Sequence, residues 1–193
     1  MENLHELKSI HELGMMTDKS YTHQYLQVYE ALFEPIRTRV TNVLEIGIMR
    51  GDSHRLWRDY FPNAQIYGLD VVNACGGLEN EERMSIFFRD AYNEESIDLL
   101  KDVQFDVIID DGPHTLDSML WAANRYARLL SPNGILVIED IPDPRWLDLI
   151  SQVVDHDIKS QMYAIDRRNA PNRFSPINDE IMFVIDKRYV RYL

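Results

Sequence analysis

The sequence predicts an α/β fold built on a doubly wound, mostly parallel sheet. Apolar segments of strand length alternate with amphipathic segments of helix length after residue 40, a pattern typical of βαβ units. The segment from Phe105 to Ile109 is almost continuously apolar, as expected for a strand covered on both faces. The first apolar strand ends at Gly47 and passes through a glycine-containing turn into a helix. Such a turn is a common binding site for small molecules.

The individual elements follow from the spacing of apolar residues. Strands are expected at residues 43–46, 65–70, 84–88, 105–109, 135–138, 161–165 and 181–185. Helices are expected at residues 2–13, 22–33, 53–60, 94–101, 116–130 and 146–154. We expect turns at residues 17–20 and 131–134, and either Asp52 or Ser53 as the cap of the helix after the glycine turn. Residues 166–179, rich in Asn, Arg and Pro, are either a lid over the substrate or a surface loop.

Length and composition predict one globular domain over residues 1–193. Cys75 is the only cysteine, which excludes an internal disulfide and a cysteine-based metal site. No apolar run approaches the roughly 20 residues of a membrane span, and no basic secretory signal opens the chain. A cytoplasmic location is therefore expected. The formal net charge of −12 argues against nucleic acid as a partner, because nucleic-acid binding needs a basic surface.

Five successive strands end in or beside a carboxylate. These residues are Glu45, Asp70, Asp90, the pair Asp110 and Asp111, and the pair Glu139 and Asp140. In open α/β sheets the ligand binds outside the carboxyl ends of the strands, so these side chains are expected to gather at one edge. Any one of them is compatible with an ordinary acidic loop, but the five together indicate a site.

Asp70 occupies a position that suggests an adenosine ligand. It follows the glycine turn by roughly 20 residues, where adenosine-binding folds place the acid that accepts the ribose hydroxyls. The alternative is a solvated aspartate at a strand end. Gly47 and Gly51 are separated by Ile-Met-Arg, which departs from the G-x-G-x-x-G pattern of NAD sites. The chain also lacks the G-x-x-x-x-G-K-[ST] pattern of nucleoside triphosphate sites.

The segment Glu45-Ile-Gly-Ile-Met-Arg-Gly, followed by Asp70 and Asp90, resembles the cofactor site of class I S-adenosylmethionine-dependent methyltransferases. The resemblance covers the chain after residue 40 and implies a Rossmann-like, seven-stranded sheet whose last strand is antiparallel. It implies that Gly47 approaches the amino-acid part of S-adenosyl-L-methionine, that Asp70 binds its ribose, and that Asp90 with Ala91 lies near its adenine. The other residues expected at the cofactor are Thr17, Lys19, Glu45, Gly51, Ser53 and Asp110.

A narrower resemblance rests on Asp110-Asp111-Gly112-Pro113-His114 together with Glu139-Asp140, and on Thr17-Asp18-Lys19 and His23-Gln24-Tyr25 upstream. These segments are similar to those of the metal-dependent O-methyltransferases that modify macrolide deoxysugars, the mycinamicin type. The resemblance implies that Asp111, Glu139 and Asp140 bind Mg²⁺ or Mn²⁺, and that His114 is the general base. Thr17-Asp18-Lys19 is similar to a segment that closes over the cofactor in that group.

The chemistry of these residue types agrees with this interpretation. A sugar hydroxyl is a poor nucleophile while it is protonated, and a hard cation with carboxylate ligands makes bound hydroxyls more acidic. A histidine near neutral pKa can then remove the proton. The alternatives are a structural His114 in a turn, a solvated edge at Glu139 and Asp140, and an Asp110 that only caps its loop. No function is assigned to His5, His11, His54 or His156.

The expected function is metal-dependent O-methylation of a sugar hydroxyl, with a deoxysugar such as rhamnose on a glycan or natural product as the acceptor. Three alternatives remain open. They are methylation of a catechol or other non-sugar diol, the activity of a cephalosporin-hydroxylase-like relative, and cofactor binding without turnover. The helices before residue 40 either cover the cofactor or build the interface of a homo-oligomer.

Overall fold

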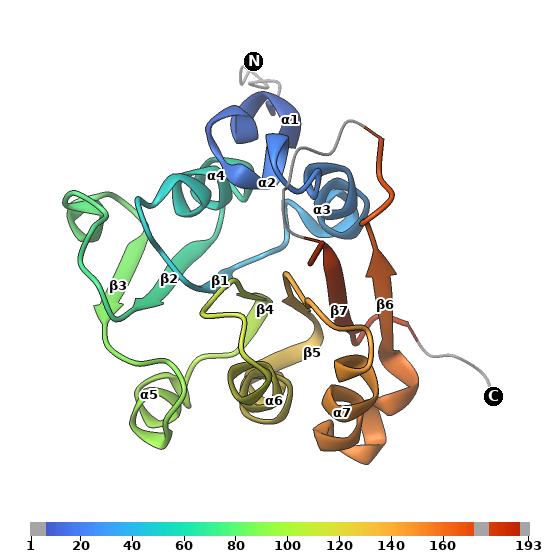
Figure 1. Ribbon diagram of the computed structural model, residues 1–193. Helices are drawn as coiled ribbons and strands as arrows, with labels where there is room; N and C mark the ends of the chain where they lie inside the picture. The colour runs from blue at the N-terminus through green and yellow to red at the C-terminus, as the bar shows by residue number, and fades with distance from the viewer. Residues whose placement is uncertain (1–6, 172–177, 190–193) are drawn as a thin grey trace.

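A computed structural model of the chain describes residues 7–171 and 178–189. It contains a seven-stranded sheet with helices on both faces (Figure 1). The strands are β1 (Asn42–Ile46), β2 (Gln65–Asp70), β3 (Met84–Phe88), β4 (Phe105–Asp110), β5 (Leu130–Ile138), β6 (Met162–Asp166) and β7 (Ile181–Asp186). Their order is β3-β2-β1-β4-β5-β7-β6. Strands β1 to β5 pair in parallel, and β7 runs antiparallel to both β5 and β6. The predicted doubly wound sheet with an antiparallel last strand is confirmed.

Two layers of helices cover the sheet. The α-helices are α1 (Ile10–Leu13), α2 (Asp18–Tyr21), α3 (Leu26–Phe33), α4 (Asp52–Tyr60), α5 (Glu94–Leu100), α6 (Leu116–Arg125) and α7 (Trp146–Val153). The first four lie on one face and the last three on the other (Figure 1). Because successive strand residues point to opposite faces, Val43 of β1 packs with the first layer, and Leu44 and Ile46 pack with the second.

The N-terminal region differs from the expected pair of long helices. Helix α1 begins only at Ile10, because Ser9 forms a capping box with Glu12: Ser9 Oγ accepts from the Glu12 N–H, and the Glu12 carboxylate accepts from the Ser9 N–H. Residues 2–6 of the predicted helix lie outside the described residues. The expected turn at residues 17–20 is largely the short helix α2. Helix α3 begins at Leu26 rather than residue 22, since Gln24 has a φ of 58° that no helix accommodates.

Two further boundaries differ from the prediction. Neither Asp52 nor Ser53 caps α4; Gly51 takes that position with a φ of 81°, and no side chain caps the helix. Strand β5 begins at Leu130, so residues 131–134, expected as a turn, belong to the strand, where its register against β4 shifts. Helix α6 accordingly ends at Arg125 and continues as a 3₁₀ turn. None of the helices in the described part of the chain has the length and apolar character that a membrane span requires.

Candidate functional site

The carboxyl ends of the parallel strands open onto a cleft of ≈ 610 Å³. Its walls include Gly47 after β1, Asp70 at the end of β2, Ala91 after β3 and His114 after β4. A second cavity of ≈ 340 Å³, lined by Thr17, Asp18 and Ser53 among others, shares Asp18, Gly47, Met49 and Asp111 with this cleft. The predicted gathering of strand ends at one edge therefore produces one continuous depression beside the glycine turn.

The glycine turn depends on Gly47. Its φ is 90°, and a Cβ atom at this position would lie 2.0 Å from the carbonyl oxygen of Asp111, so no other residue fits the observed backbone. The turn is held by Asp70: Oδ2 accepts from the N–H groups of Ile48 (2.8 Å) and Met49 (3.0 Å). Partial burial raises the pKa of Asp70, but these backbone N–H groups and that of Val72 outweigh it and hold the pKa below its ordinary value.

Asp90 and Ala91, the residues predicted at the adenine, lie in the wall of the cleft after β3. Asp90 Oδ1 accepts from the N–H of Tyr92 at 2.9 Å, and Ala91 is buried. The Ala91 carbonyl accepts from the Tyr126 hydroxyl at 2.6 Å, which anchors this wall to the turn after α6. These hydrogen bonds hold both residues in the wall of the cleft where the adenine site is predicted.

The His114 side chain lies close to two carboxylates in another part of the cleft. Its Nε2 lies 3.7 Å from Asp111 Oδ1 and 3.8 Å from Asp140 Oδ2. These three side chains offer ligand atoms that all lie within 4.8 Å of one another. His114 (φ 52°) and Asp140 (φ 54°) both have left-handed backbone conformations, which cost energy in non-glycine residues and concentrate at functional sites.

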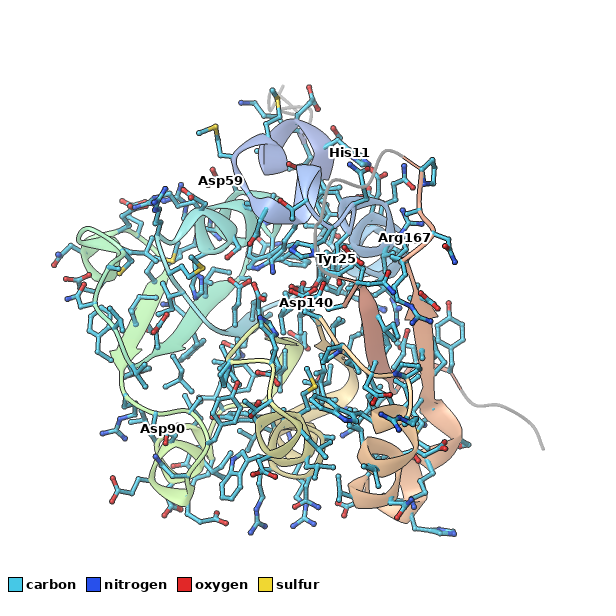
Figure 2. The ribbon with its side chains drawn as sticks, viewed as in Figure 1. His11, Tyr25, Asp59, Asp90, Asp140 and Arg167 are labelled. Atoms are coloured by element: carbon cyan, nitrogen blue, oxygen red, sulfur yellow. The ribbon has the colours of Figure 1, made fainter. Side chains whose placement is uncertain are left out.

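Glu139 has a different environment from Asp140. Its side chain is buried, and Oε2 lies 2.7 Å from the Nζ of Lys19, while Oε1 accepts from the Tyr29 hydroxyl. Lys19 is itself only 1% exposed and also binds Asp111 Oδ2 at 2.7 Å. Asp140 Oδ1 accepts from the Tyr25 hydroxyl at 2.5 Å, at the centre of the molecule (Figure 2).

The acidic side chains at this end of the sheet lie close together and are largely buried. Burial raises the pKa of Asp111 and of Glu139; the Lys19 ammonium opposes the increase, and Asp140 adds to it. Asp111 and Glu139 thus share the ammonium group of Lys19, which also lies 3.5 Å from Glu45, and Asp140 adds a further carboxylate beside them. An additional cation would relieve this repulsion.

Glu45 forms a second buried group with residues of α4. It is 0% exposed; Oε2 accepts from Ser53 Oγ at 2.8 Å and lies 2.7 Å from His54 Nδ1, while Oε1 lies 3.5 Å from Lys19 Nζ. Burial alone would raise the pKa of Glu45, but the neighbouring His54 and Lys19 lower it to about 2. The sequence did not identify His54, and its spacing from Glu45 carries no signal that could have identified it.

Several predicted cofactor residues do not reach the cavities. Asp110 lies beneath the cleft, 3% exposed, where Oδ1 accepts from the Tyr92 hydroxyl at 2.5 Å; burial raises the pKa of Asp110 to about 7. The side chain of Lys19 is occupied by the carboxylates, and Gly51 packs near Leu78. The expected lid lies partly outside the described residues, since its central residues 172–177 are not among them.

No family model matches the chain. The chain is 31% identical over 139 residues to the 8-demethyl-8-alpha-L-rhamnosyl tetracenomycin-C 2'-O-methyltransferase of Streptomyces olivaceus, an alignment that covers 67% of this chain and 36% of that protein. It is 30% identical over 135 residues to the mycinamicin VI 2''-O-methyltransferase of Micromonospora griseorubida, covering 65% of this chain and 33% of that protein. The chain spans about a third of the length of these curated relatives.

A solved structure shares the fold. The MycE methyltransferase from the mycinamycin biosynthetic pathway, in complex with Mg and SAH, superposes with a TM-score of 0.73 and 22% identity, covering 97% of this chain and 58% of that one. Its fold agrees with the strand order and the antiparallel β7 described above. The chain is thus related in sequence to sugar O-methyltransferases and has the Rossmann-like fold of a class I methyltransferase.

Proposed function

We propose that the chain is the catalytic domain of an S-adenosyl-L-methionine- and divalent-metal-dependent methyltransferase that methylates a hydroxyl group of a sugar. The observation that carries the proposal is the single cleft in which the Gly47 turn and Asp70 face the group formed by Asp111, His114 and Asp140. A donor site and an acceptor site are thereby adjacent, as a direct transfer requires.

The cofactor fits the first half of this cleft. The backbone at Gly47 leaves room that a Cβ would fill, and Asp70 keeps a partly exposed carboxylate in the wall, beside Asp90 and Ala91. S-adenosyl-L-methionine would bind there with its ribose toward Asp70 and its adenine toward Asp90 and Ala91. When bound, it supplies a methyl group on a positively charged sulfur. Thr17 and Ser53, in the adjoining cavity, would lie beside its amino-acid part.

A divalent cation fits the second half. Asp111 Oδ1 and Asp140 Oδ2 are carboxylate oxygens that face His114 and accept no hydrogen bond in the contacts among the described residues, and hard cations such as Mg²⁺ or Mn²⁺ prefer oxygen ligands. When bound, the cation would make neighbouring sugar hydroxyls more acidic. Glu139, the predicted third ligand, would have to exchange one of its bonds to Lys19 or Tyr29 in order to join.

His114 is the proposed general base. Its side chain is 36% exposed and lines the cleft, and its ring lies between the two carboxylates that would hold the acceptor's cation. His114 would accept the hydroxyl proton at Nε2 while Asp111 and Asp140 stabilise the imidazolium that forms. Thr17 and Asp18 of the N-terminal region border the smaller cavity, which supports a covering role for the first 40 residues.

Transfer of a radiolabelled methyl group from S-adenosyl-L-methionine to a panel of acceptors tests the proposal. The panel would contain methyl α-L-rhamnoside, a rhamnosylated aglycone and catechol. We expect label in a sugar product, loss of transfer in excess EDTA, and recovery when Mg²⁺ is restored. Unchanged transfer in EDTA would refute the metal role, and exclusive labelling of catechol would refute the sugar acceptor.

A further inference from the structure

Three side chains of the N-terminal segment, defined here as residues 17–29, hold the three strand-end carboxylates. The Lys19 ammonium binds Asp111 and Glu139, the Tyr25 hydroxyl donates to Asp140, and the Tyr29 hydroxyl donates to Glu139. The carboxylates themselves follow β4 and β5. A segment far away in the sequence therefore determines how these acids are oriented.

Each of these bonds occupies a particular oxygen atom. Lys19 takes Oδ2 of Asp111, which leaves Oδ1 facing His114 at 3.7 Å. Tyr25 takes Oδ1 of Asp140, which leaves Oδ2 facing His114 at 3.8 Å. The oxygen atoms that remain available therefore point to one place in the cleft.

We propose that Lys19 is a positioning residue for this site, whose ammonium group orients Asp111 and Glu139 so that the cleft binds a divalent cation beside His114. The proposal rests on the proposed function, which names the cation as the occupant. Lys19 does not itself touch the occupant, since its side chain lies behind the carboxylates and is 1% exposed.

The cost of burying a charged group explains why the Lys19 ammonium stays bound to carboxylates. A buried ammonium group is tolerated only when it is paired, and Lys19 has two carboxylates at 2.7 Å and a third, Glu45, at 3.5 Å. Without the ammonium, neither Asp111 Oδ2 nor Glu139 Oε2 keeps a described side-chain cation within bonding distance, so both carboxylates are free to reorient. Loss of a partner that orients a metal ligand typically weakens metal binding by about 10–100-fold.

The test is the affinity of the full chain for Mn²⁺, measured by electron paramagnetic resonance without S-adenosyl-L-methionine. We compare wild type with Lys19→Met and with the control Lys101→Met, whose lysine is exposed and pairs only with Asp98 among the contacts described. Lys19→Met is expected to bind Mn²⁺ at least about tenfold more weakly, and Lys101→Met to match wild type. Lys19→Arg, which keeps the charge, is expected to recover part of the loss.

The opposite outcome, stronger Mn²⁺ binding by Lys19→Met, would have a different physical cause. Removal of the ammonium also removes its repulsion of a divalent cation, so tighter Mn²⁺ binding by Lys19→Met means that Lys19 competes with the metal, and overturns the proposal. A wild-type chain that binds no Mn²⁺ overturns the metal site of the proposed function and the role of Lys19 with it. Equal affinities in wild type and Lys19→Met overturn the role of Lys19 alone.

A second measurement does not require Lys19→Met to fold. Nuclear magnetic resonance of ¹⁵N-lysine in the wild-type chain detects ammonium protons that are protected from water, and Lys19→Arg assigns the signal. We expect the Lys19 signal to shift and persist when Mg²⁺ is added. Its disappearance on Mg²⁺ binding would show that the metal displaces the ammonium, which contradicts a positioning role.

Discussion

Gly47, after β1, packs closely against the backbone of Asp111, after β4. Replacement by alanine forces a Cβ to within 2.0 Å of the Asp111 carbonyl oxygen at a φ of 90°. Gly76 is the matched control, because its φ is 62° but no heavy atom lies within 4 Å of the added Cβ. We expect Gly76→Ala to lower the free energy of unfolding by about 1–2 kcal/mol, the cost of the left-handed conformation. Gly47→Ala is expected to lower it further and to weaken S-adenosyl-L-methionine binding.

Urea unfolding and calorimetry of both variants check this prediction. Equal stabilities for the two variants would show that the close approach of Asp111 is absent in solution.

Replacement of His114 tests its proposed role as the general base. His114→Ala removes the proposed base while leaving the glycine turn and Asp70 in place, so turnover is expected to fall on the order of 10²–10⁴-fold with cofactor affinity almost unchanged. His156→Ala, at an exposed position in the turn after α7, is the control. Steady-state kinetics and calorimetry measure the two effects separately. Turnover near that of wild type would eliminate His114 as the base.

Glu45, at the junction of β1 and α4, makes the free energy of unfolding depend on pH. Burial raises the pKa of Glu45, but His54 and Lys19 reduce it to about 2, from an ordinary value of 4.5. A carboxyl whose pKa is lowered by folding contributes stability above its unfolded pKa, and this contribution disappears as the pH falls toward the folded pKa. We expect Glu45→Gln to lower the free energy of unfolding at neutral pH by on the order of 2–3 kcal/mol.

Urea titrations of wild type and Glu45→Gln across the acidic range measure this contribution. The difference between the two proteins is expected to shrink as the pH falls from 4.5 toward 2. A difference that stays constant over this range would mean that Glu45 is not ionised by these partners.

Elements of the parallel sheet could be predicted because each carries its own signal. Strands β1 to β4 are apolar segments bounded by turns, and their ends carry the acids that form the site. The N-terminal helices were predicted less accurately, because Gln24 breaks the regular spacing with a φ of 58° that its residue type does not announce. Residues 131–134 read as a turn because Pro132 and Gly134 are turn residues, although β5 runs through them as an irregularity between the pairs Phe105–Leu130 and Val107–Ile135.

The candidate-site residues that directly follow strands could be predicted from the sequence. The side chains that contact them from distant parts of the chain could not. Asp111, His114 and Asp140 follow β4 and β5 directly, so the topology alone brings them together. The contacts of Lys19, Tyr25 and Tyr29 join residues about a hundred positions apart. A lysine is seldom buried and a tyrosine usually belongs to the core, so composition does not reveal these roles.

At the scale of the whole molecule, the formal net charge is −12, and several of the acids that contribute to it line the cleft. A ligand that binds only the folded state raises its stability, by about 2.7 kcal/mol at a concentration 100 times its Kd. We therefore expect Mg²⁺ to raise the Tm of the wild-type chain and of the control Asp148→Asn, an exposed residue of α7. Asp111→Asn and Asp140→Asn are expected to lose this increase. An equal increase in all four proteins would indicate binding elsewhere.

Binding of S-adenosyl-L-methionine is the property on which the whole account depends. Isothermal titration calorimetry of the full chain with Mg²⁺ present measures it without knowledge of the acceptor. We predict saturable binding of one molecule per chain, weakened by on the order of tenfold in Asp70→Asn, which loses the negative charge proposed to accept the ribose hydroxyls. The absence of binding by the folded wild-type chain at millimolar cofactor would contradict the central claim that this cleft holds a methyl donor.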